Sequence, residues 1–199
     1  MVGPQILDSL NERKELMKRY TWSVGVMLFA ITTSLSAADK FTLRVNAGAD
    51  KEFTDKAGNV WKPDKEYVKG QGYGFVAGQT VDRGTNMKIE GTEDARIYQT
   101  EHYSMKAFKA EVPKRTFTVR LHFAEPDEGI TADGERVFTV KIQGKEVLKD
   151  FDVRKTAGAS QKAVVKEFKE IEATDGIIDI GFEIKKQNPE INGIEIIGE

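Results

Sequence analysis

The sequence contains no cysteine and only two histidines, and these shortages limit the chemistry open to it. Without cysteine, neither a disulfide nor a thiolate metal cluster can stabilise the fold. Two histidines without acidic residues at matching spacing do not make a zinc site. No serine lies in a nucleophile-elbow sequence, and the glycine-rich stretch 70–74 lacks the strand and helix context of a phosphate-binding loop. The chain must be held together by packing, and the common catalytic motifs are missing.

An excess of one charge is also lacking. The 30 Lys and Arg nearly balance the 32 Asp and Glu, which gives a formal net charge of -2. The charges are interspersed rather than clustered, so no basic face indicates a nucleic-acid partner. A chain of 199 residues is ample for one domain with its own hydrophobic core. We expect one folded domain with a solvated, charged surface and no nucleic-acid partner.

Residues 1–37 have the layout of a secretory signal peptide. The basic pair Lys18-Arg19 precedes an apolar run, and small residues at Ala37 and Ala38 suit cleavage there. The run is about ten residues long, too short to cross a bilayer. We predict an N-terminal extension and signal over 1–37 and a mature domain over 38–199. The protein would be secreted or periplasmic, without membrane contact after cleavage.

This interpretation of the N-terminus has alternatives. The apolar run would also fit a membrane anchor or a buried helix. The initiator could be Met17 rather than Met1, because Met17-Lys-Arg-Tyr20 resembles an ordinary signal start.

From residue 39 onward, apolar and polar residues alternate in short segments. Such alternation fits strands with one face on a core and the other face toward water. In the segment 116–123, Phe117, Val119, Leu121 and Phe123 would face inward. The same pattern appears in the segments 41–45, 137–142, 178–184 and 193–197.

The connections between these segments favour antiparallel pairing. Turn residues separate them, as at Gln143-Gly144 and Asn192-Gly193, and no ten-residue amphipathic helix lies between them. A parallel α/β fold needs such helices. The sequence therefore predicts an all-β fold, an antiparallel jelly-roll β-sandwich. Segment 50–87 shows little strand pattern, which predicts a long ordered loop that is functional or packed by its own aromatics.

Acidic residues gather around one predicted loop, 126–134. They are Glu125, Asp127, Glu128, Asp133 and Glu135. Two carboxylates at a productive separation would suit a glycosidase, and hard oxygen ligands would suit calcium. A solvated loop between two strands needs fewer assumptions. Of the histidines, His122 is expected to be solvent-facing or hydrogen-bonded in a structural role, whereas His102 could belong to a site.

Three tyrosines lie outside the alternating apolar sets: Tyr73, Tyr98 and Tyr103. A tyrosine ring offers an apolar face to the C–H side of a pyranose, and its hydroxyl can bond a sugar hydroxyl. Planar polar side chains that could complete such a site are Gln99, Gln187 and Asn188. Alternatively, the tyrosines only cap the ends of the sandwich.

Taken in order, the motifs of the chain resemble the malectin family and its bacterial relatives over about residues 41–197. Each motif is weak alone, and their order carries the resemblance. They are Arg44-Val-Asn-Ala-Gly48, Asp55 with Gly58, Trp61 and Asp64, Gly72-Tyr-Gly74, Ile97-Tyr-Gln-Thr-Glu-His-Tyr103, Leu121-His-Phe-Ala-Glu125, Arg136-Val-Phe-Thr-Val-Lys-Ile-Gln-Gly144, Asp150-Phe-Asp-Val153, Ala157-Gly158 and Pro189-Glu-Ile-Asn-Gly-Ile194.

The resemblance implies a malectin-like, galactose-binding-like sandwich that binds glucose-containing oligosaccharides without cleaving them. Matching the motifs assigns ligand-binding positions to Tyr73 and Tyr103. The family's aromatic pair after Phe-Ala-Glu is replaced here by Asp127 and Glu128, and its late aspartate by Gln187. We therefore expect these five residues to bind the ligand, with no catalytic residue and no cofactor. A structural calcium ion remains an open alternative.

The replaced aromatics leave the function open between classes. The first hypothesis is an exported carbohydrate-binding protein whose partner is an oligosaccharide or polysaccharide. The second is an extracellular structural or protein-interaction module, with a protein partner on the same sandwich. A glycoside hydrolase, or an accessory module of one, is the third.

Overall fold

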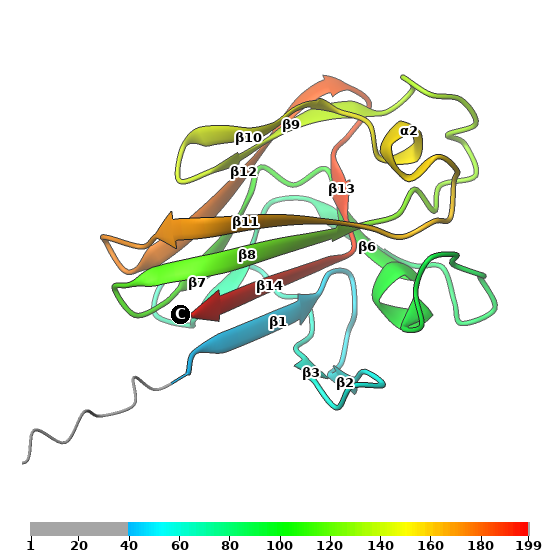
Figure 1. Cartoon of the computed structure of the whole chain (residues 1–199). Helices are drawn as coiled ribbons and strands as arrows, with labels where there is room; N and C mark the ends of the chain where they lie inside the picture. The colour runs from blue at the N-terminus through cyan, green and yellow to red at the C-terminus, as the bar shows by residue number, and fades with distance from the viewer. Residues whose placement is uncertain (1–39, 199) are drawn as a thin grey trace, which may run out of the picture. The chain divides into compact units, whose positions relative to one another are not determined.

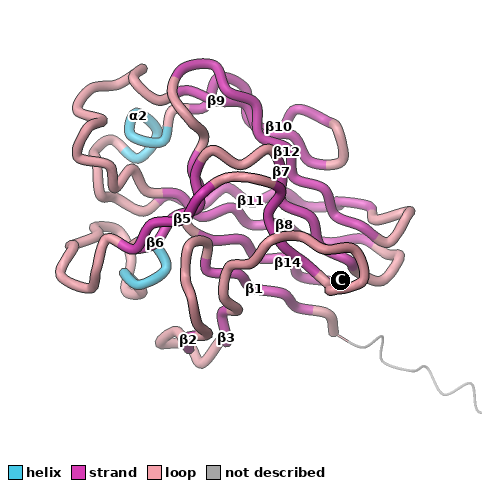
Figure 2. Tube along the Cα trace, turned by 180° about the vertical axis from the view of Figure 1, so that it is seen from behind, coloured by secondary structure: helices cyan, strands magenta, loops and turns pink. Residues whose placement is uncertain are grey.

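A computed structural model describes residues 40–198; the predicted signal and extension over 1–37 lie outside the described residues. Two antiparallel sheets face each other in this domain (Figures 1 and 2). In sheet order, the first contains β1 (Thr42–Asn46), β14 (Gly193–Gly198), β8 (Thr116–Phe123) and β11 (Val164–Glu172). The second contains β10 (Lys145–Phe151), β9 (Val137–Ile142), β12 (Ile177–Lys186), β7 (Ala107–Glu111) and β4 (Tyr73–Val76). The predicted all-β sandwich is confirmed.

Smaller elements lie at one end of the two sheets (Figure 1). A three-stranded sheet contains β13 (Glu190–Ile191), β6 (Thr100–Tyr103) and β5 (Gln79–Asp82), and a two-stranded sheet contains β2 (Phe53–Thr54) and β3 (Val60–Trp61). Within residues 40–198, the helical elements are the 3₁₀ turn η1 (Ala95–Tyr98) and the five-residue helix α2 (Val153–Ala157). Segment 50–87, predicted as a loop, therefore supplies β2 to β5, whose short runs carry too few residues to show alternation.

The main core lies between the two large sheets, as the alternation of β8 predicts. Phe117, Val119, Leu121 and Phe123 are all fully buried there. They pack against residues of the facing sheet that include Phe138 of β9. Burying a side chain of this size contributes about 1.5–3 kcal/mol relative to leaving it exposed.

The opposite face of β8 does not simply meet water, as the alternation suggested. His122 is only 7% exposed, and its ring packs edge-on against Trp61 with the centroids 5.2 Å apart. Its Nε2 lies 3.0 Å from Oε1 of Glu195, and its Nδ1 lies 2.9 Å from the hydroxyl of Tyr98. His122 is thus a hydrogen-bonded structural residue, as expected, beneath a second apolar cluster that sequence alternation could not reveal.

The turn after β1 presses against β6 and so helps to place that strand. Gly48 has a φ of +80°, and its amide donates to Asp64 Oδ2 at 2.7 Å. A Cβ added at Gly48 would lie 2.3 Å from the carbonyl oxygen of Glu101. Only glycine fits this close backbone approach without displacing β6.

Gly48→Ala and Gly58→Ala form a matched pair for testing this contact. Both positions have positive φ, +80° and +84°, so both alanines incur a backbone penalty of about 1 kcal/mol. A Cβ at Gly58 meets no atom within 4 Å. We expect Gly48→Ala to lower the free energy of unfolding by a further ~1–3 kcal/mol, because the added methyl overpacks the contact. Urea denaturation measures both losses, and equal losses would contradict the packing of Gly48 on β6.

Candidate functional site

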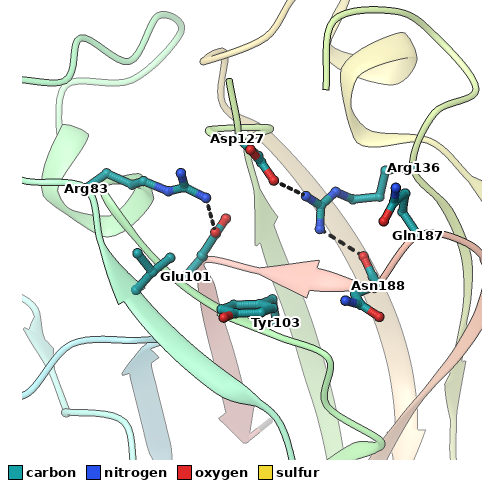
Figure 3. Close-up of a pocket in the computed structure, with 8 residues that line it drawn as sticks. Arg83, Glu101, Tyr103, Asp127, Arg136, Gln187 and Asn188 are labelled. Carbon is teal, nitrogen blue, oxygen red and sulfur yellow. Dashed lines mark hydrogen bonds and ion pairs between the residues drawn. The ribbon is translucent and has the colours of Figure 1, made fainter. Parts of the chain in front are cut away.

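The antiparallel pair of β5 and β6 lies between two cavities, because alternate residues of a strand point to opposite faces. Glu101 and Tyr103 of β6 line one cavity, of about 280 Å³, and His102 lines the other, of about 400 Å³. The first cavity is drawn in Figure 3. Its lining residues are Val81, Arg83, Glu101, Tyr103, Asp127, Arg136, Gln187 and Asn188.

Arg136, just before β9, joins two other segments at this cavity. Its Nε lies 2.8 Å from Oε2 of Glu125, and its Nη2 donates to Oδ2 of Asp127 at 3.1 Å. Its Nη1 donates to the backbone carbonyl of Asn188 at 2.9 Å (Figure 3). A planar guanidinium with several fixed donors suits such a junction. Arg136 therefore fixes the loop after β8 relative to the turn between β12 and β13.

A second guanidinium holds the opposite wall. Nη2 of Arg83 donates to Oε1 of Glu101 at 2.6 Å (Figure 3). The Glu101 side chain is 2% exposed, so solvent screens this ion pair weakly. Burial opposes the charge of Arg83, but the hydrogen bond and the charge of Glu101 outweigh it and raise the pKa of the guanidinium. The wall is thus a fixed pair of opposite charges.

Two further carboxyl groups are buried among these residues without lining the cavity. Glu125 is 1% exposed, and burial raises its pKa to about 7, although the charge of Arg136 acts in the opposite direction. Glu190 is fully buried, and burial raises its pKa well above the ordinary value, with the charges of Glu125 and Glu101 adding to the effect. A carboxyl that keeps its proton near neutral pH avoids the cost of a buried charge.

The structure brings together three of the five residues predicted to bind a ligand: Tyr103, Asp127 and Gln187 line the cavity. Glu128 follows Asp127 in the loop after β8, but it is exposed and is not among the lining residues. Asn188, also considered from the sequence, is among them.

Tyr73 lies outside this cavity. Its hydroxyl donates to the carbonyl of Pro63 at 2.9 Å, and the ammonium of Lys65 lies 4.4 Å from its ring centroid. Burial, followed by the charges of Asp64 and Glu52, raises the pKa of Tyr73 to about 12. Its assignment to a ligand site stays a prediction, and the contacts of its ring here are structural.

Two other residues considered from the sequence are buried and make hydrogen bonds inside the domain. Tyr98 is 3% exposed, with its hydroxyl against His122. Gln99 is buried, and its Nε2 donates to the carbonyl of Met87 at 2.8 Å. Neither lines the cavity beside Tyr103: Tyr98, at the end of η1, packs in the second apolar cluster, and Gln99 is bonded to the backbone of the segment before η1.

The acidic loop is exposed at Glu128 and Asp133, as expected, whereas Glu125, directly before it, is buried. Glu125 is buried against Arg136, and Glu135 accepts hydrogen bonds from the amides of Thr131 and Ala132 at 2.6 and 2.9 Å. Backbone donors lower the pKa of Glu135. The loop therefore uses part of its charge to fix its own shape. Sequence could not show this, because the partner of Glu125 is chosen by tertiary contact.

Sequence reasoning missed Arg83, Glu101, Arg136 and Glu190. Glu101 lies inside a motif among more conspicuous aromatics, and Glu190 begins the short buried strand β13. A charged residue beside an apolar neighbour in a β-segment was the available signal for Arg136 and Glu190, whereas Arg83 and Glu101 have polar or glycine neighbours and gave none.

In the second cavity, the histidine that could bind a ligand is already hydrogen-bonded. His102 lines it, but its Nδ1 lies 2.8 Å from Oδ2 of Asp64 and its Nε2 lies 3.0 Å from the carbonyl of Ala77. Its ring also stacks on Phe75, with the centroids 4.0 Å apart. Both ring nitrogens of His102 are thus engaged, which leaves none for a ligand.

Within residues 40–198, no group of three or more His, Cys, Asp or Glu side chains is arranged to hold a metal ion. In the same range, no helix is long and apolar enough to cross a membrane. The structural calcium ion considered from the sequence stays a prediction without a specific site.

Comparison with known proteins identifies relatives of the whole described domain. The family model for the malectin domain matches residues 41–198. Malectin of Danio rerio is 30% identical over 144 residues, which cover 70% of this chain and 47% of the relative. Receptor-like protein 4 of Arabidopsis thaliana is 29% identical over 154 residues, which cover 72% of this chain and 23% of the relative. The chain thus spans about half or less of the length of these relatives.

Solved structures share the sandwich. A β-glucuronidase of Bacteroides uniformis superposes with a TM-score of 0.70 at 24% identity, over 80% of this chain and 18% of that chain. The ANXUR1 extracellular domain of Arabidopsis thaliana gives a TM-score of 0.66 at 19% identity, over 78% and 47% of the two chains. At these identities the likeness shows the fold alone.

The buried carboxyls make the stability depend on pH in a definite direction. Folded Glu125 keeps its proton up to about pH 7, against an ordinary pKa of 4.5, so the folded chain binds more protons than the unfolded chain between these values. The free energy of unfolding should therefore fall as pH rises through this window, by about 1 kcal/mol per pH unit for one proton. The hydrogen bond from Arg96 lowers the pKa of Asp82 to about 2, so Asp82 affects the free energy of unfolding at lower pH.

Urea denaturation between pH 4.5 and 8 measures this slope. Glu125→Gln, the uncharged isostere, should reduce the slope and leave the share that Glu190 contributes, whereas Glu146→Gln at an exposed position on β10 should leave it unchanged. A stability that rises steadily from pH 5 to 7.5 in the unmodified protein would show that Glu125 is ionised in the folded state.

Proposed function

This chain belongs to the malectin domain family, and from that premise we propose that it is an exported, non-catalytic protein that binds glucose-containing glycans. The malectin domain is a carbohydrate-binding and extracellular module, and the family includes malectin and receptor ectodomains. The signal-peptide layout of residues 1–37 supports export. The cavity beside Tyr103 is the proposed binding site, with an oligosaccharide or polysaccharide as partner.

The observation that carries this proposal is the placement of Tyr103 beside free amides. Its ring is half-buried in the cavity wall, and its hydroxyl donates to Oε1 of Gln79 at 2.6 Å, which fixes the ring orientation. Gln187 and Asn188 are exposed at the cavity, and their side chains have no hydrogen-bond partner within residues 40–198. A fixed ring with neighbouring donors and acceptors suits one face and the hydroxyls of a pyranose.

The backbone at Gln187 also supports a binding role. Its φ is +61°, in the left-handed region that a glutamine rarely adopts, and this conformation carries a cost on the order of 1 kcal/mol. The strained residue is exposed and lines the cavity. Such strain persists where the surrounding structure imposes it, often at ligand sites.

The carboxyls at the site favour binding over hydrolysis. A glycosidase needs two carboxyls that flank the scissile bond, with one free to donate a proton. The carboxylates that line the cavity, Glu101 and Asp127, are both paired with guanidinium groups. Glu125 and Glu190, whose raised pKa would suit an acid, are buried behind the lining. We therefore propose a non-catalytic role.

A second candidate function is a protein- or peptide-binding module. Tyr103 is the single aromatic residue among the eight that line the cavity, and the family's aromatic pair is replaced by Asp127 and Glu128. Loss of two stacking partners could weaken sugar binding tenfold or more. A partner captured independently of sugar, and equally by Tyr103→Ala, would favour this candidate over glycan binding.

Tyr103→Ala tests the stacking surface. We expect the Kd for glucose-containing disaccharides, measured by calorimetry, to rise about five- to tenfold because the ring contributes on the order of 1 kcal/mol beyond area burial. Tyr103→Phe keeps the ring and should retain most of the affinity.

Tyr67→Phe is a control at another half-buried tyrosine, whose hydroxyl bonds Glu111. Tyr73→Ala should not change the affinity for a monosaccharide confined to the Tyr103 cavity, but it should weaken an oligosaccharide that also reaches Tyr73. Binding that survives Tyr103→Ala unchanged, or no sugar binding in a glycan array, would refute the proposed site.

Gln187→Gly separates stability from binding. Glycine relieves the positive φ, so the free energy of unfolding should rise by about 0.5–1 kcal/mol, while loss of the amide should raise the Kd severalfold. Glu170→Gly is the control, because Glu170 is exposed on β11 with a φ of +58°. It should give the stability change without the loss of affinity. Weaker binding in both variants would indicate a general backbone effect instead.

A further inference from the structure

The charged side chains that line the Tyr103 cavity differ in how far a ligand can reach them. The exposed fraction of the side chain is 38% for Asp127, 23% for Arg83, 7% for Arg136 and 2% for Glu101. Asp127 therefore presents the most accessible charge of the lining, and that charge is negative. Because an exposed charge on a cavity wall acts on whatever enters, its sign bears on which sugars can bind.

Arg136 is hydrogen-bonded to Asp127, but it is a poor receptor for an anion. Its Nη1 donates to the carbonyl of Asn188, its Nη2 donates to Oδ2 of Asp127, and its Nε lies 2.8 Å from Oε2 of Glu125. Its side chain is nearly buried, so it offers little surface to a ligand. An anion at Nη2 would lie beside the carboxylate of Asp127, as the arrangement in Figure 3 shows.

The second guanidinium is also compensated. Arg83 donates to Glu101 at 2.6 Å, so the lining contains two guanidinium groups and two carboxylates. Glu125, behind the lining, has a pKa of about 7 and adds negative charge where it is ionised. The walls therefore carry no excess of positive charge that could attract an acidic sugar.

A hydroxyl group and an acidic group would meet Asp127 differently. A hydroxyl can donate to the carboxylate of Asp127 and accept from the side-chain amide of Gln187 or Asn188, which also line the cavity. A carboxylate or sulfate has no proton to donate and would bring its charge against that of Asp127. Near a protein surface, repulsion between two unit charges a few ångströms apart is enough to weaken binding about tenfold. An ammonium group would be attracted instead.

We propose that Asp127 makes the Tyr103 cavity select sugars by charge: neutral and positively charged sugar units bind, and units that carry a carboxylate or sulfate are rejected. This inference rests on the proposed function, because it names the glycans that the same site accepts. Asp127 is then a specificity-determining residue, and Tyr103 supplies the apolar contact. The cavity is at the small end of the range for ligand sites, so a charge on a bound sugar unit lies close to Asp127.

Three disaccharides of glucose that differ only at C6 of the terminal unit test this selection. The group at C6 is a hydroxymethyl, a carboxylate or an aminomethyl, and each Kd is measured by calorimetry at pH 6, where Glu125 is mostly protonated. In the unmodified protein we expect the Kd of the acidic sugar to be about tenfold above that of the neutral sugar. The Kd of the amino sugar should be equal to or below the neutral value, because Asp127 attracts the ammonium group.

Asp127→Asn removes the charge but keeps a side-chain oxygen that can accept from Arg136, so the wall keeps its shape. The ratio of the acidic to the neutral Kd should fall to within about threefold of one, and the ratio of the amino to the neutral Kd should rise about two- to fivefold. These opposite changes distinguish lost charge selection from a general distortion, which would weaken all three sugars alike.

Two further variants are controls. Asp127→Glu keeps a carboxylate and should keep the rejection of the acidic sugar. Asp133→Asn removes the same charge from another exposed carboxylate of the loop, which is paired with Arg154 and does not line the cavity, so both ratios should stay as in the unmodified protein.

Equal Kd values for the acidic and neutral sugars in the unmodified protein, or unaltered ratios in Asp127→Asn, overturn the charge selection and leave the proposed function in place. If none of the three sugars binds, the proposed function fails and the selection falls with it.

Discussion

The candidate site depends on the contacts that the guanidinium group of Arg136 makes. This group contacts Glu125 and Asp127 of one loop and the Asn188 carbonyl of another, and so fixes two walls of the cavity with one planar group. A lysine at this position would have one nitrogen for these three directions and could not hold them in the same geometry. The rigid sandwich brings the segments near each other, and Arg136 sets the distance between them.

The contacts of Arg136 bury several charged groups, and burying charge costs free energy unless it is compensated. Removing one member of a buried ion pair typically costs about 3–5 kcal/mol, because the other charge is left without compensation. Around Arg136 the compensation is incomplete, since carboxyls outnumber guanidinium groups and Glu190 has no hydrogen-bond partner within residues 40–198. The fold accommodates this by keeping protons on buried carboxyls, as the raised pKa of Glu125 and Glu190 indicates.

This chain combines the malectin-domain scaffold with a largely polar cavity. Tyr103 supplies the aromatic ring, and the loop after Phe-Ala-Glu supplies Asp127, whose carboxylate bonds Arg136. Asp127 thus gives Arg136 a partner at the cavity rim. Hydrogen bonds and charge hold these walls in place, on a fold that the malectin domain match and the solved sandwiches share.

The sequence by itself determined the long strands with clear alternation, because alternation is local: the inward faces of β8 and β9 follow from every second residue, and the fully buried Phe117 and Phe138 confirm them. The short strands β2 to β5 showed no such pattern. The ordered motifs also predicted the family and three residues of the cavity. Only the tertiary structure placed Tyr73 outside that cavity and covered His122 with Trp61. It alone brought Glu190 under Tyr103 and buried Glu125 against Arg136. Side-chain burial and charge pairing arise between segments distant in the chain, so no local pattern encodes them.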